Sequence, residues 1–153
     1  MVRERKPMSA VGSLETGLLG KINVLRARRG LARLRLHERL GAAAFEHSQQ
    51  MGRRGFFAHR SADGSSFAER VRHYYGPGGY RYWSIGENLI WSSGALAPSG
   101  VVESWMRSPG HRTVLLDARW RELGISAVQV EAAPGVYQGM DVTIVTADFG
   151  VRR

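Results

Sequence analysis

Four residues in this chain have side chains that could bind a metal ion or carry acid–base chemistry: His59, Glu87, Glu103 and His111. Imidazole and carboxylate groups together can ligate a divalent ion such as Zn²⁺, or transfer protons near neutral pH. The four residues are far apart in the sequence, so no local spacing rule ties them together. Structural roles are therefore also open for two of them: His59 as a hydrogen-bonded structural residue, and Glu87 as a carboxylate that caps backbone N–H groups of its own turn.

Other nucleophiles and ligands are less well supported by the sequence. His47 lies on the apolar stripe of an expected helix, which indicates a packed core histidine. Ser61, Ser84 and Ser108 each lie near a histidine, but none lies in a Gly-x-Ser-x-Gly turn, so a serine hydrolase is disfavoured. The chain has no cysteine, which excludes disulfides, a thiol nucleophile and cysteine-ligated zinc.

Two short segments are expected to present the candidate residues on turns. Residues 101–106 predict an amphipathic helix with Trp105 on its buried stripe. Ser108-Pro109-Gly110 is expected to end this helix and hold His111 on a tight turn. Gly86-Glu87-Asn88 is interpreted as a second turn, among aromatic residues.

The remaining pattern predicts helices followed by strands. Further helices are expected at 13–29 with Ser13 as its cap, at about 38–53, and from Ser66 to about residue 74, where Ser66 and Glu69 have capping-box spacing. Alternating apolar residues predict antiparallel strands at 122–130 and 140–147. Because helices and strands do not alternate as βαβ units, the chain is expected to form an α+β domain. Residues 1–12 are interpreted as a flexible lead-in and 13–153 as one domain.

Composition limits the class of protein. A chain of 153 residues with 43% hydrophobic and 23% charged residues is expected to form one globular domain. No apolar segment approaches the ~20 residues of a transmembrane helix, and no signal peptide is visible at the start, so either the protein stays inside or a leader was removed. The net charge of +9 would attract nucleic acid, anionic lipid or an acidic polymer. No nucleic-acid-reading motif accompanies it, so no specific nucleic-acid partner is expected.

Three motifs in a fixed order resemble a known family. They are Phe56-Phe57-Ala58-His59-Arg60-Ser61, Gly86-Glu87-Asn88-Leu89, and Trp105-Met106-Arg107-Ser108-Pro109-Gly110-His111-Arg112. Together they resemble the bacterial branch of the CAP superfamily, which comprises cysteine-rich secretory proteins, antigen 5 and pathogenesis-related 1 proteins and is also called the SCP domain. The resemblance covers residues 14–150. It implies a three-layer α-β-α sandwich with a central, mainly antiparallel sheet.

The resemblance also implies a site. Family members have a large cleft with two histidines and two acidic residues, which in some members binds a divalent metal, often zinc. His59 and His111 match the histidines, and Glu87 matches the Gly-Glu-Asn glutamate. In eukaryotic members the second acid follows the tryptophan of the helix, a place without an acid here, and Glu103 is the nearest candidate. The residues expected to line the ligand cleft are Asn88, Ser108, Tyr82 and Trp83.

The expected function is that of a secreted, periplasmic or cell-envelope binding module. Its ligand would be a lipid, a peptide or a cell-envelope component, with zinc as the candidate cofactor. The alternative is a metal-assisted hydrolase, in which His59 and His111 hold the ion and Glu87 is the general base. The sequence leaves the oligomeric state open.

Overall fold

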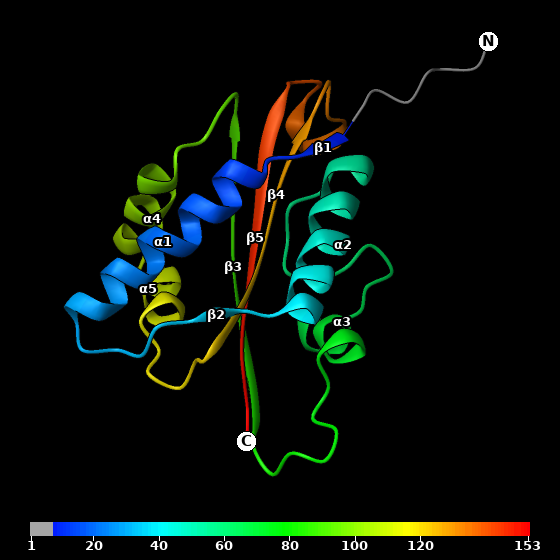
Figure 1. Ribbon diagram of the computed structural model, residues 1–153. Helices are drawn as coiled ribbons and strands as arrows, with labels where there is room; N and C mark the ends of the chain where they lie inside the picture. The colour runs from blue at the N-terminus through cyan, green and yellow to red at the C-terminus, as the bar shows by residue number, and fades with distance from the viewer. Residues whose placement is uncertain (1–7) are drawn as a thin grey trace.

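The computed structural model describes residues 8–153 and has three layers, with a sheet between two groups of helices (Figure 1). This confirms the expected α-β-α sandwich. The helices are α1 (Gly12–Arg28), α2 (Glu38–Arg54), α3 (Phe67–Tyr74), α4 (Pro98–Arg107) and α5 (Pro109–Leu115), with a short 3₁₀ turn at Gly135–Tyr137. The strands are β1 (Met8–Ala10), β2 (Arg35–Leu36), β3 (Trp83–Ser93), β4 (Glu122–Val130) and β5 (Val142–Arg152).

The sheet is mainly antiparallel and has the strand order β1-β4-β5-β3. Only the short β2 runs parallel to its partner, the start of β4. Strand β3 forms one edge of the sheet, where it pairs with β5 along its whole length. The register places Glu87 opposite Asp148. Directly opposed residues of antiparallel strands share a face, so these two side chains lie on one side of the sheet and Asn88 on the other.

Apolar helix faces cover both sides of the sheet. Helices α1, α4 and α5 lie on one side (Figure 1) and contribute Leu18, Trp105 and Leu115, respectively, to the largest core cluster. Helices α2 and α3 lie on the other side, where Met51 and Val71 are fully buried. Within residues 8–153, no helix combines the length and the apolar character needed to cross a membrane.

The helix starts agree only in part with the sequence patterns. The capping box of α3 is confirmed, because the Ser66 hydroxyl accepts a hydrogen bond from the Glu69 backbone N–H at 3.2 Å. The expected Ser13 cap of α1 is wrong: the helix begins at Gly12, after Val11. The backbone N–H of Val11 donates to the Ala127 carbonyl at 2.9 Å, so pairing with the sheet fixes where α1 begins.

The expected turn at Gly86-Glu87-Asn88 is wrong, because these residues lie in the middle of β3. Gly86 allows Trp120 to pack closely against the strand and does not form a turn. A Cβ atom at this position would lie 2.7 Å from the Trp120 ring, so only glycine lets the indole pack against the strand. Asn88, two residues after Gly86, is fully buried.

The expected end of the helix at Ser108 is confirmed, because α4 ends at Arg107, but the expected tight turn before His111 is wrong. Pro109 is the first residue of α5, a position where its fixed φ and missing N–H suit a helix. His111 therefore lies in the first turn of α5, directly after Ser108 ends α4.

The ends of the sheet extend beyond the expected strands. Strand β4 confirms the predicted 122–130, whereas β5 continues past the predicted 147 to Arg152. Of the predicted lead-in, residues 8–10 form β1 and pair with β4, and residues 1–7 lie outside the described residues.

Candidate functional site

Two consecutive residues of the edge strand β3 hold the two candidate histidines. Glu87 Oε1 lies 2.9 Å from Nδ1 of His59, which belongs to the segment between α2 and α3. On the other face of the sheet, the side-chain amide of Asn88 donates to the backbone carbonyl of His111 at 3.0 Å. Because β3 is at the edge of the sheet, a histidine from each outer layer can approach the same strand.

Glu87 has no free oxygen. Its side chain is only 1% exposed, and Oε2 accepts a hydrogen bond of 2.6 Å from the Arg70 guanidinium. Arg70, on α3 and 3% exposed, also donates to the His59 carbonyl at 3.3 Å and to Oδ2 of Asp148 at 3.4 Å. Arg70 thus connects the His59 segment to both carboxyl groups.

The two buried carboxyl groups titrate in opposite directions. Burial raises the pKa of Asp148 well above its ordinary value, and the charge of Glu87 raises it further. Burial acts to raise the pKa of Glu87 too, but the hydrogen bond to His59, the Asp148 carboxyl group and the charge of Arg70 hold this pKa below its ordinary value. Glu87 is therefore the more acidic of the two carboxyl groups, and the Arg70 guanidinium lies against both.

The arrangement leaves His59 available as a ligand. Its Nδ1 faces Glu87, so Nε2, on the far side of the ring, points away from the carboxylate, and the side chain is 55% exposed. A carboxylate that fixes one imidazole nitrogen while the other stays open is typical of metal-ligating histidines.

His111 is half-buried and suited to remain neutral. Burial lowers its pKa, and the nearby charge of His59 lowers it further. A neutral imidazole is the form that binds metals. Among residues 8–153, however, no three histidine or acidic side chains lie close enough together to hold a metal ion. The histidine pair would therefore bind an ion with water or an external ligand in the remaining positions.

Glu103 lies apart from these contacts. It is on the exposed side of α4, with a side chain 66% exposed and an oxygen 3.9 Å from the guanidinium of Arg107, one turn away. The structure shows no contact between Glu103 and either histidine, so its catalytic role stays a prediction.

The other three expected cleft residues, Ser108, Trp83 and Tyr82, connect elements of the fold or make hydrogen bonds within it. Ser108 is half-buried and connects α4 to α5. The Trp83 indole donates to the Tyr75 carbonyl at 2.7 Å, and the Tyr82 hydroxyl lies 3.5 Å from the Arg119 guanidinium. Trp83 is four residues before Glu87, about 13 Å away along the strand. Their part in ligand binding stays a prediction.

An open pocket of about 320 Å³ adjoins the Arg70 side of the site. It lies between α2, the segment after His59 and α3. The residues that line it are mostly acidic or polar, and they do not include the four expected cleft residues: Glu46, Gln50, Ser61, Asp63, Ser65, Glu69, Arg70 and His73.

Sequence reasoning did not find Arg70 or Asp148 as site residues. A single acidic residue within an apolar strand is a usable signal for Asp148, because such a group is buried only with a partner. Arg70 carries no comparable signal, since it lies in a short helix next to the exposed Arg72. The interpretation of His47 as a core residue is confirmed: it is fully buried, and its Nε2 lies 2.6 Å from the Ala58 carbonyl.

A His47→Gln variant is expected to lose less stability between pH 7 and pH 5 than the wild type. Burial lowers the pKa of His47 below its ordinary value of 6.5, and the charge of Arg70 lowers it further. As the pH falls through 6.5, His47 takes up a proton in the unfolded chain before it does so in the folded protein, so the free energy of unfolding decreases. Glutamine can still donate to Ala58 but does not titrate. Urea unfolding at the two pH values measures the difference, with the exposed His73→Gln as control; equal losses in wild type and His47→Gln would contradict this role.

Comparison with known proteins assigns the family. The model of the cysteine-rich secretory protein family, CAP, matches residues 19–149. An uncharacterized protein of Bacillus subtilis, YkwD, is 30% identical over 121 residues, which is 79% of this chain and 45% of YkwD. An uncharacterized membrane protein of the same organism, YlbC, is 31% identical over 111 residues, 72% of this chain and 30% of YlbC. This chain thus spans less than half the length of either relative.

Solved structures agree in fold. An outer surface protein from Borrelia burgdorferi superposes with a TM-score of 0.74 at 20% identity, covering 97% of this chain and 99% of that one. An extracellular SCP-domain protein from Bacillus anthracis gives a TM-score of 0.68 at 23% identity, over 93% of this chain and 41% of that one. The sequence match, the layered sheet and the histidines at its edge lead to one assignment: this chain belongs to the CAP, or cysteine-rich secretory protein, family.

Proposed function

We propose that this CAP domain is an extracytoplasmic binding module whose ligand site contains a zinc ion held by His59 and His111. The observation that carries the proposal is the engagement of Glu87, whose two oxygens are occupied by His59 and Arg70. A buried carboxylate in this arrangement orients an imidazole. The zinc ion would supply a Lewis-acidic centre with open positions for a polar group of the ligand.

The same engagement disfavours the hydrolase alternative. A general base must reach the proton that it abstracts, directly or through one water. Glu87 is 1% exposed and pairs with the guanidinium of Arg70, which also lowers its basicity. We therefore favour binding over catalysis, with a lipid, a peptide or a cell-envelope component as the ligand. The location outside the cytoplasm is supported by the Bacillus anthracis and Borrelia burgdorferi neighbours, described as an extracellular and an outer surface protein.

Zinc titration of the chelator-treated protein tests the proposal. We expect the wild type to bind about one equivalent of zinc, and His59→Ala combined with His111→Ala to abolish this binding, because the pair supplies both proposed protein ligands. The Glu87→Gln variant is expected to bind about 10–100-fold more weakly, the usual effect of losing a carboxylate that orients a ligand.

His73→Ala is the matched control, because His73 is exposed and on α3. Unchanged zinc binding in the double histidine variant would refute the site. Metal-dependent turnover that disappears in Glu87→Gln would instead support the hydrolase. Recovery of a bound ligand from the purified protein, in a ratio near one to one, would identify the ligand class.

A further inference from the structure

One end of the sheet carries an arginine in, or within two residues of, each of the strands that meet there. Arg35 of β2 lies opposite Glu122 of β4, and Arg152 of β5 lies opposite Trp83 of β3. Neighbouring strands are about 4.8 Å apart, so these strand ends span roughly 15 Å. We call this region the arginine end; its arginines are Arg35, Arg81, Arg119, Arg121, Arg152 and Arg153.

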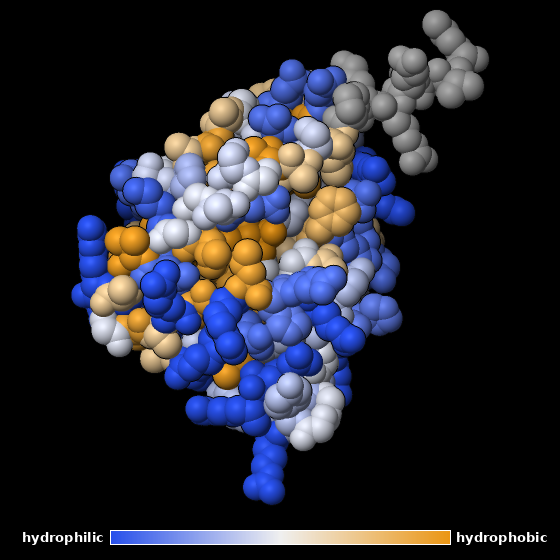
Figure 2. Space-filling model, in the orientation of Figure 1, coloured by the Kyte–Doolittle hydropathy of each residue, from blue (hydrophilic) through white to orange (hydrophobic). Residues whose placement is uncertain are grey.

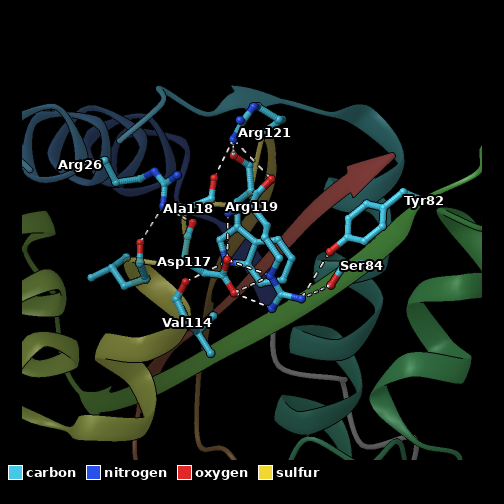
Figure 3. Close-up of polar contacts among 10 residues, drawn as sticks. Arg26, Tyr82, Ser84, Val114, Asp117, Ala118, Arg119 and Arg121 are labelled. Atoms are coloured by element: carbon cyan, nitrogen blue, oxygen red, sulfur yellow. Dashed lines mark hydrogen bonds and ion pairs between the residues drawn. The ribbon is translucent and has the colours of Figure 1, made fainter. Parts of the chain in front are cut away.

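Two carboxylates of the arginine end, Asp117 and Glu122, are already bonded within the protein. Asp117 accepts from the Arg119 guanidinium at 2.6 Å (Figure 3). Glu122 accepts a hydrogen bond of 2.7 Å from the Tyr75 hydroxyl. Arg121 donates to backbone carbonyls, including those of Ala118 and Trp120 at 2.8 Å, and these neutral acceptors leave its charge in place (Figure 3). Six arginines against these two carboxylates and Glu38, the residue after His37, leave an excess of three positive charges among these groups.

Among residues 8–153, the opposite end of the sheet has no such excess. The last-turn residues Arg53 and Arg54 of α2 lie there, together with Glu131 and Asp141 of the β4–β5 connection. Strand β5 has 11 residues, so the two ends are about 35 Å apart. This distance exceeds the screening length of about 8 Å at physiological salt, so each end acts on a charged partner separately.

Two exposed apolar side chains accompany the arginines. Leu36 is 60% exposed, the highest value among the large hydrophobic residues of the described chain, and Tyr80 is 50% exposed. The guanidinium of Arg152 lies 4.8 Å from the centre of the Tyr80 ring and 3.4 Å from Nε2 of His37, the residue after Leu36. Leu36 lies opposite Leu123, on the α1 side of the sheet, whereas Tyr80 and Arg152 lie on the α3 side, so each side of the arginine end has one exposed apolar side chain.

Hydrophobic and hydrophilic side chains are segregated on the face of the molecule that leads to the arginine end. Figure 2 shows hydrophobic side chains gathered in the middle of the face formed by α1, β2 and α2, and hydrophilic side chains covering the lower end, where the chain terminates. A soluble polyanion gains little from exposed leucine or tyrosine. At a bilayer surface, by contrast, such side chains can enter the headgroup region while arginines pair with lipid phosphates.

We propose that the arginine end docks on an anionic phospholipid membrane surface, with Leu36 and Tyr80 entering the headgroup region. The domain would lie on the membrane surface without crossing the bilayer. The contact does not involve His59, Glu87 or His111. Each arginine near an anionic bilayer strengthens binding about fivefold, and the effect falls with added salt. The proposal therefore stands or fails separately from the zinc site.

Vesicle sedimentation tests the docking surface with the full chain. The probes are vesicles of phosphatidylcholine with 30% phosphatidylglycerol, where about 30% anionic lipid gives a negative surface potential, and vesicles of phosphatidylcholine alone. We expect binding to the anionic vesicles only. Arg35→Glu combined with Arg81→Glu changes two exposed side chains of the arginine end and is expected to weaken binding by at least about tenfold.

The matched control, Arg53→Glu combined with Arg54→Glu, makes the same change in net charge at the other end. It is expected to alter binding less than about twofold, because that end lies beyond the screening length. Equal losses in the two charge-reversal variants would refute a localised surface. Leu36→Ser combined with Tyr80→Ser is expected to weaken vesicle binding but not binding to soluble polyphosphate. If this variant binds vesicles as well as the wild type does, the surface recognises polyanions and the membrane proposal fails.

Discussion

Replacement of Arg70 by leucine is expected to lower the free energy of unfolding by about 3–5 kcal/mol, the usual cost of removing one partner from a buried ion pair. The Arg70 side chain is 3% exposed and faces two buried carboxyl groups. Without it, the ionised Glu87 would stay in the protein interior without its guanidinium partner, and the His59 carbonyl would lose its donor. Urea unfolding followed by circular dichroism measures the effect.

The pH dependence of this loss identifies its cause. In the wild type the charge of Arg70 helps to lower the pKa of Glu87, so the leucine variant should have a higher Glu87 pKa. The deficit should be largest near pH 7 and shrink as the pH falls and Glu87 takes up a proton, because a neutral carboxyl group is less costly to bury. Arg72→Leu is the control, since it removes an exposed arginine from the same helix. A deficit that is equal at pH 7 and pH 4 would indicate lost packing and not an unpaired charge.

The parts of the fold that could be predicted are those with a local signal. The helices that became α2 and α3 have apolar residues at helical spacing, and α3 also has the Ser66–Glu69 capping box. Strand β4 alternates clearly enough for both ends to be predicted. Such signals depend only on neighbouring residues, so the chain itself carries them.

Strand β3 could not be predicted because its sequence contains two misleading features. Trp83, Ile85, Leu89 and Trp91 alternate as a strand requires, but Glu87 occupies the central position of the same face. Gly86 and Asn88 also look like turn residues, although the first makes room for Trp120 and the second holds His111. These residues are needed for contacts with segments that are distant in the sequence, and local sequence rules do not reveal such contacts.

The sequence names the candidate site residues but does not show how they are connected. The family motifs identify His59, Glu87 and His111, yet the partner that neutralises Glu87 comes from α3 and its neighbour Asp148 comes from β5. Both contacts join segments that are distant in the sequence, and they form only when the layers pack. Glu103 shows the converse: its sequence position near Trp105 suggested the site, but its direction on α4 places it in solvent.

A Trp105→Ala variant is expected to lose about 3–5 kcal/mol of unfolding free energy, the range found for removing a large aromatic side chain from a core. Trp105 is 1% exposed in the largest core cluster, and its indole N–H donates to the Leu89 carbonyl at 3.0 Å. The variant therefore leaves a cavity and removes the donor to a buried carbonyl of β3. Thermal and urea unfolding measure the loss.

The same substitution should also weaken zinc binding, because Trp105 anchors α4 to β3 and α4 leads directly into the first turn of α5, where His111 lies. Trp105→Phe keeps most of the apolar volume but not the indole N–H, so it should recover part of the stability. Ser104→Ala, on the exposed side of the same helix, should stay within about 0.5 kcal/mol of the wild type. If Trp105→Ala loses stability while the folded variant binds zinc as the wild type does, the position of His111 depends on Asn88 and α5 alone, and α4 serves only the core.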